Sequence, residues 1–396
     1  MLKGKRSIDI FGLRSRVDTL FNNHFNSAYQ KKKSKIQVDL EGFMCGLGKD
    51  IHMCSPSDIC LFLAWCDGKG KTKIHNVKCP DIGDRKTSCG CPLRLAYSTV
   101  VTKVSQLKSV FSNMGRLKVW CHESYTGNPV CSREVDIYTK QIKVEQSKAH
   151  VMPGQAKPMF LPKLADIFFY IGRQLEGKVS SPASRFILAR DQALFKLMFF
   201  GGDRAHDSGV MLSQELRELP GGSGFLIRHT WGKTHNVSNP KVFSILRSKD
   251  VNICPVRGIE VYLATARDMG IDLSTGYLFR PVFRDVVREQ SLSYEAIYAR
   301  LKYYLGILGL DEGETPHSFR GGCALSLQAC VGNDDGVASL MQHIGWATEA
   351  SARHYARSDR INQAEKAASF MASSGVLGKV GNSHFEEYDL GKVTLQ

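Results

Sequence analysis

Two residues near position 317 have types and a spacing that could form part of an anion site. His317 and Arg320 lie three positions apart, so both side chains leave one face if a helix begins there. Thr315 and Pro316 precede them and are typical of a helix N-terminus, with Thr315 as the cap. The free N–H groups of such a terminus add to an anion site. Alone, a His-x-x-Arg pair is more often an ordinary surface feature, so the prediction depends on its neighbours.

A tryptophan and a tyrosine follow at a spacing that would return both to one pocket. The sequence reads Ile344-Gly345-Trp346, and Tyr355 comes nine residues after the tryptophan, across a segment that predicts a threonine-capped helix. Alone, a tyrosine near a helix end is more often part of the packed core. Taken together, the two segments resemble the motifs of the tyrosine recombinases, the phage-integrase family, in the form that has tryptophan at this position.

The other motif positions of that family are present in the family's order. Arg204 follows an apolar helix, and Asp207 lies three residues later. Lys233 comes 29 residues after Arg204, in the turn of a predicted β-hairpin. The resemblance covers about residues 160–372, with residues 332–335 as a surface insertion that the family pattern lacks.

The resemblance implies how these residues would bind the reacting phosphate of DNA. Arg204 and Arg320 would bind the nonbridging oxygens bidentately while negative charge develops on them. Asp207 would orient Arg204 or the helix that carries it. His317 and Trp346 would donate further N–H groups to the same phosphate.

The resemblance also implies which residues make and break bonds. Tyr355 would be the nucleophile and form a 3′-phosphotyrosyl link, and Lys233 would protonate the departing 5′-oxygen. Catalysis would need no metal and no nucleotide cofactor. His343 and His354 flank the motif outside its pattern, and we interpret them as structural or DNA-backbone residues.

The resemblance therefore predicts a site-specific DNA recombinase or integrase that serves a mobile element. Its partners would be double-stranded DNA and further copies of the chain, in a homotetramer on two DNA sites. Residues 361–371, an amphipathic segment, would dock on a neighbouring copy. Two alternatives stay open: a nicking and closing enzyme like the type IB topoisomerases, and a domesticated DNA-binding protein with little catalysis.

The charge distribution favours nucleic acid as a partner. The chain carries 53 basic and 38 acidic residues, a net charge of +15. Residues 1–150 hold 25 basic and 13 acidic residues, a surplus of 12 out of the 15. Such asymmetry indicates a part that meets a polyanion, although a merely basic soluble surface is the plainer alternative. The densest run, Lys31, Lys32, Lys33 and Lys35, is either a DNA-phosphate contact or import signal, or a solvated helix face.

One group of cysteines has a composition that suits zinc. Nine of the 12 cysteines lie in the first 131 residues. We find no secretory signal, so we expect reduced thiols rather than disulfides. His75, Cys79, Cys89 and Cys91 would supply the four ligands of a tetrahedral structural zinc. The alternative is a set of ordinary buried or loop cysteines. This cysteine-rich loop resembles recombinases of eukaryotic crypton- or DIRS-type elements, which implies the nucleus if the chain is eukaryotic and the cytoplasm otherwise.

The pattern of apolar residues predicts a mostly α fold with a small antiparallel β-sheet, and no membrane span. We expect strands near residues 225–228 and 241–243 and helices near 188–200, 294–310, 319–331, 335–344 and 348–357. The expected domains are a basic arm at 1–35, a helical core-binding DNA-binding domain with the Cys-rich loop at 36–145, a linker at 146–159, a catalytic domain at 160–372 and a tail at 373–396.

Overall fold

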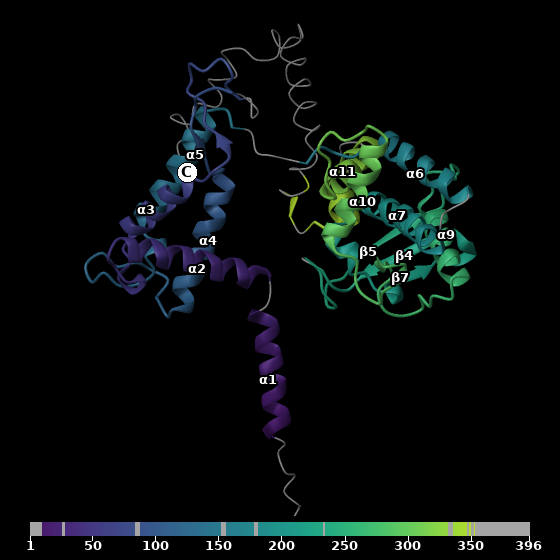
Figure 1. Cartoon of the computed structure of the whole chain (residues 1–396), viewed down its shortest axis with the longest axis horizontal. Coiled ribbons are helices and arrows are strands. Elements are labelled where there is room, and N and C mark those ends of the chain that lie inside the picture. The colour runs from purple at the N-terminus through teal and green to yellow at the C-terminus, as the bar shows by residue number, and fades with distance from the viewer. Residues whose placement is uncertain are drawn as a thin grey trace, which may run out of the picture. The chain divides into compact units, whose positions relative to one another are not determined.

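The protein consists of two compact units, which we describe separately: an N-terminal unit, Met1–Gly154, and a C-terminal unit, Gln155–Gln396. The computed structural model describes residues 10–25, 28–83, 88–151, 156–177, 181–232, 234–331, 336–346, 348–349 and 352. The predicted fold class is confirmed, since both units are mostly helical and carry small antiparallel sheets (Figure 1). Within these ranges, no helix is long and apolar enough to cross a membrane.

The N-terminal unit is a set of helices with one short hairpin. Its elements are α1 (Ile10–Phe25), α2 (Ala28–Gly46), η1 (Ile51–Met53), α3 (Pro56–Asp67), β1 (Thr72–Lys73), β2 (Leu93–Arg94), α4 (Tyr97–Asn113), η2 (Pro129–Cys131) and α5 (Arg133–Lys148). The start of α3 shows how local sequence fixes an element. The Ser55 side chain accepts from the backbone N–H of Asp58, and the Asp58 carboxylate accepts from the backbone of Ser55, a capping box.

The two boundaries expected for the core-binding domain, residues 36 and 145, both fall inside helices of the N-terminal unit. Ile36 and Leu40 of α2 are buried with residues of α3, α4 and α5, so the expected arm at 1–35 ends within a packed helix. At the other end, α5 continues to Lys148. Gln146 is buried there, and its side-chain amide bonds the backbone of Leu95 and Tyr97. The first residues of the expected linker therefore belong to the core.

The C-terminal unit is built around one buried helix. Its elements are α6 (Leu161–Glu176), α7 (Pro182–Phe200), α8 (Ala205–Gly209), η3 (Ser213–Glu215), β3 (Leu216–Glu218), η4 (Pro220–Gly222), β4 (Gly224–His229), β5 (Lys241–Leu246), α9 (Pro255–Asp268), β6 (Val282–Phe283), β7 (Val286–Val287), α10 (Tyr294–Ile307), α11 (His317–Val331) and α12 (Gly336–Ile344). Helix α7 lies between α6 and α9 (Figure 1), and its residues from Ala189 to Phe199 are all buried.

The sheet of the C-terminal unit is an antiparallel β3-β4-β5 meander. Burial alternates strictly along β5, so Lys241, Phe243 and Ile245 face inward. His229 at the end of β4 pairs with Lys241 at the start of β5. The two strands include the predicted segments 225–228 and 241–243, and the connection between them carries residues 230–240.

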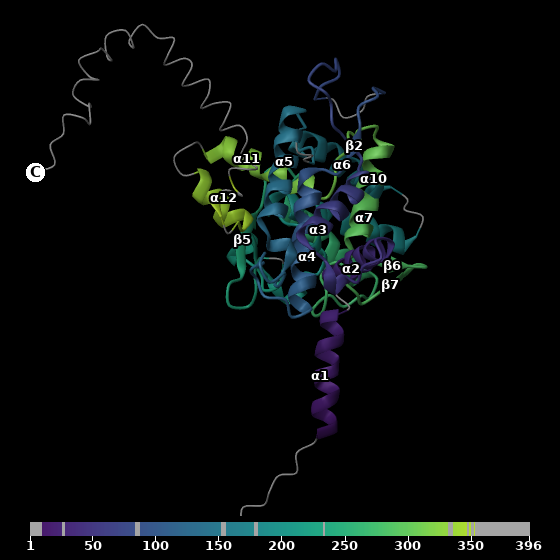
Figure 2. The same ribbon diagram turned by 90° about the vertical axis from the view of Figure 1, so that its left-hand side faces the viewer.

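Close packing brings the last described helices to the end of α7. A Cβ on Gly322 would lie 1.7 Å from the carbonyl oxygen of Met159, so only glycine lets the segment before α6 cross α11. A Cβ on Gly202, which has φ +57°, would lie 2.9 Å from Ile344. Helix α12 lies beside α11 and the beginning of β5 (Figure 2). The turn after α7, the β4–β5 hairpin and α12 therefore meet at one place.

The predicted helices of this unit agree with the structure at their cores and differ at their ends. Helix α7 begins at Pro182, before the expected residue 188, because Ser181 caps it. Helix α10 ends at Ile307 rather than 310, and Gly309 has φ +67° just beyond it. Most of the expected helix at 348–357 lies outside the described residues.

Candidate active site and candidate metal centre

Arg204 connects helix α8 with the β4–β5 connection. It is the residue before α8, and its side chain is 22% exposed. The Nη1 atom donates to Asp207 Oδ2 at 3.3 Å and to Thr234 Oγ1 at 3.2 Å. The guanidinium group is therefore held at the surface by one carboxylate and one hydroxyl.

Asp207 lies where it can orient Arg204. Its side chain is 2% exposed and its Oδ2 lies 3.5 Å from Nε2 of His235. Burial acts to raise the pKa of Asp207, but the contacts with His235 and Arg204 outweigh it and lower the pKa. The ionised carboxylate thus helps to fix the position of the guanidinium.

Arg320 is buried and holds three segments together. Its Nη1 atom donates to the carbonyl oxygens of Gly202, at 2.7 Å, and Ile344, at 3.0 Å. Its guanidinium carbon lies 5.0 Å from the centre of the Trp346 ring. The structure therefore brings together Arg320 and Trp346, and it places both beside the turn that leads to Arg204.

His317 is exposed in the first turn of α11. Its backbone N–H donates to Thr315 Oγ1 at 3.3 Å, so the threonine caps this helix as predicted. Ser318 is buried beside it and accepts from the backbone of Thr315. The imidazole thus stands at the N-terminal end of α11, where the helix dipole favours an anion.

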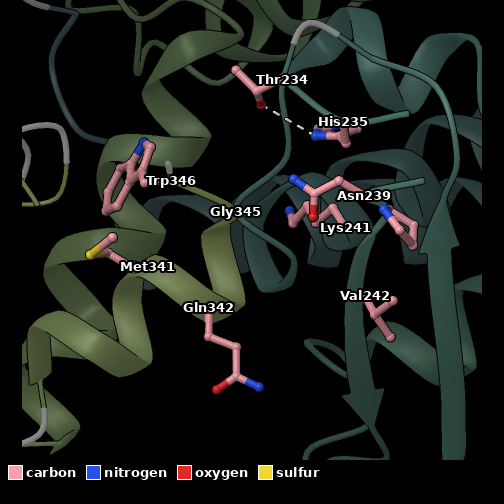
Figure 3. A pocket seen from close by; sticks show the side chains of 10 residues that line it. Thr234, His235, Asn239, Lys241, Val242, Met341, Gln342, Gly345 and Trp346 are labelled. Atoms are coloured by element: carbon pink, nitrogen blue, oxygen red, sulfur yellow. Dashed lines mark hydrogen bonds between the residues drawn. The ribbon is translucent and has the colours of Figure 1, made fainter. Parts of the chain in front are cut away.

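A pocket with a cavity volume of about 330 Å³ lies between the β4–β5 hairpin and the end of α12. Figure 3 shows that Met341, Gln342 and Trp346 line one side, whereas polar side chains of the hairpin line the other. The full lining is Thr234, His235, Asn239, Pro240, Lys241, Val242, Met341, Gln342, Gly345 and Trp346. Thr234, which contacts Arg204, and Trp346, which contacts Arg320, therefore line the same pocket.

Lys241, which lines this pocket, belongs to a network of buried charged side chains that the sequence analysis did not predict. Lys241 Nζ bonds the Asp203 carboxylate and donates to the Gly201 carbonyl oxygen at 2.7 Å. Asp203 Oδ2 lies 2.8 Å from Nε2 of His229. On its other side, Nδ1 of His229 lies 3.6 Å from Glu215. The sequence signal that could have revealed this network is Lys241, a lysine at an inward-facing position of a strand with alternating burial.

The charge states of the side chains in this network follow from the partner that each one contacts. Burial acts to lower the pKa of His229, but Asp203 outweighs it and raises the pKa to about 9. Burial acts to raise the pKa of Asp203, whereas Lys241 and His229 lower it far below its usual range. Glu215 accepts from the backbone N–H and hydroxyl of Thr230, both at 2.6 Å, and despite burial its pKa falls to about 2. At neutral pH Asp203, His229 and Glu215 are therefore charged, whereas burial lowers the pKa of Lys241 against the opposing effect of Asp203.

Several predicted residues lie outside the described part of the chain. They are Lys233, Tyr355, the insertion at 332–335, the amphipathic segment 361–371 and the tail 373–396. Of the two flanking histidines, His354 also lies outside it. His343 is described and has a structural contact, because its Nε2 lies 2.7 Å from the carbonyl oxygen of Phe200.

The structure brings the four predicted zinc ligands together in the loop between β1 and β2. The ligand atoms of His75, Cys79, Cys89 and Cys91 all lie within 4.8 Å of one another. His75 Nδ1 is 3.4 Å from the sulfur of Cys79 and 3.5 Å from that of Cys89. Ligands of a tetrahedral zinc, with bonds of about 2.0–2.3 Å, stand about 3.5–3.8 Å apart. One imidazole and three thiols at this spacing fit zinc.

The lysine run does not form one uniform surface. Lys31, Lys32 and Lys35 are exposed on α2. Lys33 is 6% exposed and donates to Ser109 Oγ of α4 at 3.1 Å. The expectation that all four lysines meet DNA is therefore wrong for Lys33, because it lies on the face of α2 that packs against α4.

Comparison with protein families gives a match for the N-terminal unit. Residues 25–144 match the ALOG domain. Protein LIGHT-DEPENDENT SHORT HYPOCOTYLS 5 of Arabidopsis thaliana is 31% identical over 110 residues, which are 27% of this chain and 57% of that protein. Protein LIGHT-DEPENDENT SHORT HYPOCOTYLS 6 is 29% identical over 109 residues, 27% of this chain and 52% of that protein. The chain spans about half the length of these curated relatives.

Comparison with solved structures finds DNA recombinases at low similarity. The XerH site-specific recombinase in a post-cleavage complex with palindromic difH substrate is 15% identical, with a TM-score of 0.48 over 82% of this chain and 74% of that one. A lambda integrase dimer bound to a COC′ core site is 11% identical, with a TM-score of 0.47 over 89% and 78% of the two chains. Likeness at this level does not assign a family or a function.

Proposed function

We propose that this protein is a tyrosine recombinase that cuts and rejoins double-stranded DNA, with Tyr355 as its nucleophile. The observation that carries the proposal is the gathering of motif residues that are far apart in the sequence. Arg320 bonds Gly202, two residues before Arg204, and its guanidinium lies over the Trp346 ring. Arg204 in turn bonds Thr234, which lines the same pocket as Trp346.

The site suits a phosphate that gains negative charge during the reaction. Arg204 is held at the surface by Asp207 and Thr234, so it can offer its remaining N–H groups to a nonbridging oxygen. Arg320 is fixed in advance by two backbone carbonyls and an indole ring. Donors that are already in place need no reorganisation when charge develops, and each is typically worth about 3–4 kcal/mol in the transition state.

The bond changes follow from the residues that the motif supplies. The Tyr355 hydroxyl gives its proton to solvent, and its oxygen attacks phosphorus and forms the phosphotyrosyl bond as the bond from phosphorus to the 5′-oxygen breaks. Lys233 gives its proton to that oxygen. Rejoining reverses these steps with a 5′-hydroxyl as the attacking group. The catalytic role of both residues rests on the sequence motif.

The wider setting is part of the same proposal. The enzyme acts as a homotetramer on two DNA sites, in the nucleus, for the integration or recombination of a mobile element. The N-terminal unit binds DNA with its basic surface, including Lys31, Lys32 and Lys35. His75, Cys79, Cys89 and Cys91 hold a structural zinc, which crosslinks the loop between β1 and β2 and takes no part in catalysis.

A second candidate is a DNA-binding protein that retains the fold without catalysis. The burial of Arg320 favours it, because bonds to the carbonyls of Gly202 and Ile344 would preserve this arginine for stability alone. In that case the residues that line the pocket would serve DNA binding or packing, and Tyr355 would have no covalent role.

The deciding experiment looks for a covalent adduct. Full-length wild type, Tyr355→Phe and Tyr303→Phe are incubated with nicked suicide duplexes that carry the element's candidate ends, and the products are separated on a denaturing gel. Tyr303 is 48% exposed on α10 and makes a matched control. We expect an adduct from wild type and Tyr303→Phe and none from Tyr355→Phe.

Each other outcome selects a different function. Tight DNA binding without an adduct from any of the three proteins supports the non-catalytic DNA-binding protein. An adduct accompanied by relaxation of any supercoiled plasmid, without joining of two sites, supports a topoisomerase-like enzyme. An adduct that persists in Tyr355→Phe rules out the assigned nucleophile.

A further inference from the structure

The β4–β5 connection holds an exposed tryptophan beside the candidate active site. Trp231 is 65% exposed. Its ring centre lies 6.1 Å from that of His206, at an interplanar angle of 55°. The His206 side chain is itself 62% exposed. The two rings therefore form an open aromatic surface, which we call the Trp231–His206 surface.

The backbone on both sides of Trp231 is fixed, so the exposure of the ring is not a consequence of a loose loop. Thr230 donates its backbone N–H and its hydroxyl to Glu215, both at 2.6 Å. On the other side, Gly232 donates its N–H to the carbonyl oxygen of His235 at 3.1 Å. A Cβ on Gly232 would lie 2.3 Å from the His235 ring and 3.1 Å from the Asp207 carboxylate. The fold thus fixes residues 230 and 232 and leaves the indole of Trp231 in solvent.

The position of this surface connects it to the phosphate-binding residues. His206 is the second residue after Arg204, and its Nδ1 lies 3.7 Å from Asp207 Oδ1. Asp207 binds Arg204, which also bonds Thr234, three residues after Trp231. The Trp231–His206 surface is therefore connected to Arg204 through Asp207 and through the residues that lead to Thr234.

We propose that the Trp231–His206 surface stacks on a nucleobase adjacent to the phosphate that is cleaved, and so binds DNA whose base is unstacked at a nick or a distorted step. This proposal rests on the proposed DNA substrate and extends it to a specific contact. An aromatic ring can stack on any of the four bases, so the surface positions the strand without reading its sequence.

The test measures binding, which does not require cleavage. Wild type, Trp231→Ala, Trp231→Phe and Phe283→Ala are titrated with a nicked 30-base-pair duplex at low salt. Phe283 is 57% exposed on β6 and serves as the control for the loss of an exposed ring. We expect Trp231→Ala to weaken binding roughly tenfold, the usual size of one stacked base. Trp231→Phe should retain most of the affinity, and Phe283→Ala should bind like wild type.

A second series assigns the effect to stacking. Each of the four nucleotides that flank the nick is replaced in turn by an abasic nucleotide. At one of these positions the difference between wild type and Trp231→Ala should disappear, because no base is left to stack. An equal difference at all four positions, or affinity of Trp231→Ala equal to that of wild type, would overturn the proposal.

The result is separable from that of the adduct experiment. Loss of stacking weakens binding whether or not Tyr355 forms a covalent bond. If an adduct forms while Trp231→Ala binds and reacts like wild type, only the stacking contact is wrong. If no adduct forms while Trp231→Ala still weakens binding at one nucleotide, the stacking contact stands and the catalytic proposal fails.

Discussion

Replacing Asp203 with asparagine should destabilise the C-terminal unit severely, because this carboxylate compensates two buried cations. The exposed fraction of the side chain is 1% for Asp203, 1% for Lys241 and 0% for His229. An asparagine has nearly the same shape and can still form hydrogen bonds, so the change removes the negative charge with little change in packing.

Two estimates of the loss agree. Removal of one partner from a buried ion pair typically costs about 3–5 kcal/mol in the free energy of unfolding. The pKa of His229 stands at about 9, against 6.5 for an ordinary histidine. At 1.36 kcal/mol for each pKa unit, that difference corresponds to roughly 3 kcal/mol. For a unit of this size, each kcal/mol lowers Tm by about 2–4 °C, so we expect a fall of about 6–20 °C.

The loss should depend on pH with a definite sign. Because the folded state raises the pKa of His229, its stabilisation is complete below about pH 6.5 and disappears as pH rises through about 9. Asp203 has a lowered pKa, so its contribution is present throughout this range and is lost only in acid. The difference in stability between wild type and Asp203→Asn should therefore be larger at pH 6 than at pH 9.5.

The measurement is calorimetry of the full chain at both pH values. Phe62→Leu, a change in the buried core of the N-terminal unit, identifies the transition of that unit. Asp268→Asn removes an exposed carboxylate from the C-terminal unit and should change stability by less than about 0.5 kcal/mol. A loss below about 1 kcal/mol for Asp203→Asn at pH 6, or one that grows toward pH 9.5, would refute the reasoning.

Three further predictions concern other parts of the chain. Purified protein should contain about one zinc, and Cys89→Ser or a chelator should remove it and lower the Tm of the N-terminal unit; protein prepared without chelator and free of zinc would contradict this. Gly322→Ala should cost more than about 3 kcal/mol because its Cβ meets the Met159 carbonyl oxygen, whereas Gly321→Ala, whose nearest atom is 3.8 Å away, should fold normally in denaturation assays. Lys35→Ala should reduce the salt slope of DNA binding by about 1, and Lys33→Ala should lower stability by about 1 kcal/mol instead; equal slopes for the two variants would show that Lys33 also meets phosphate.

Much of the fold was predictable because its signals are local. The end of α7 at Gly201, the strands on either side of residues 230–240 and the cap of α11 at Thr315 all follow from neighbouring residues. The burial of Lys33 was also predictable, since it shares a helix face with Ile36 and Leu40 at spacings of three and seven. Its neighbours in a lysine run obscured that periodicity.

The sequence by itself determined which residue types are available for chemistry, and their order along the chain. Arg204, His317, Arg320 and Trp346 are recognisable as a set because motif spacing does not depend on how the chain packs. Only the tertiary structure decided that Arg320 is buried on two carbonyls and that Trp231 is held in solvent. It also decided that Asp203 joins Lys241 to His229. These facts depend on the β4–β5 register and on contacts between residues tens of positions apart, because burial and charge pairing are properties of packed elements and not of local sequence.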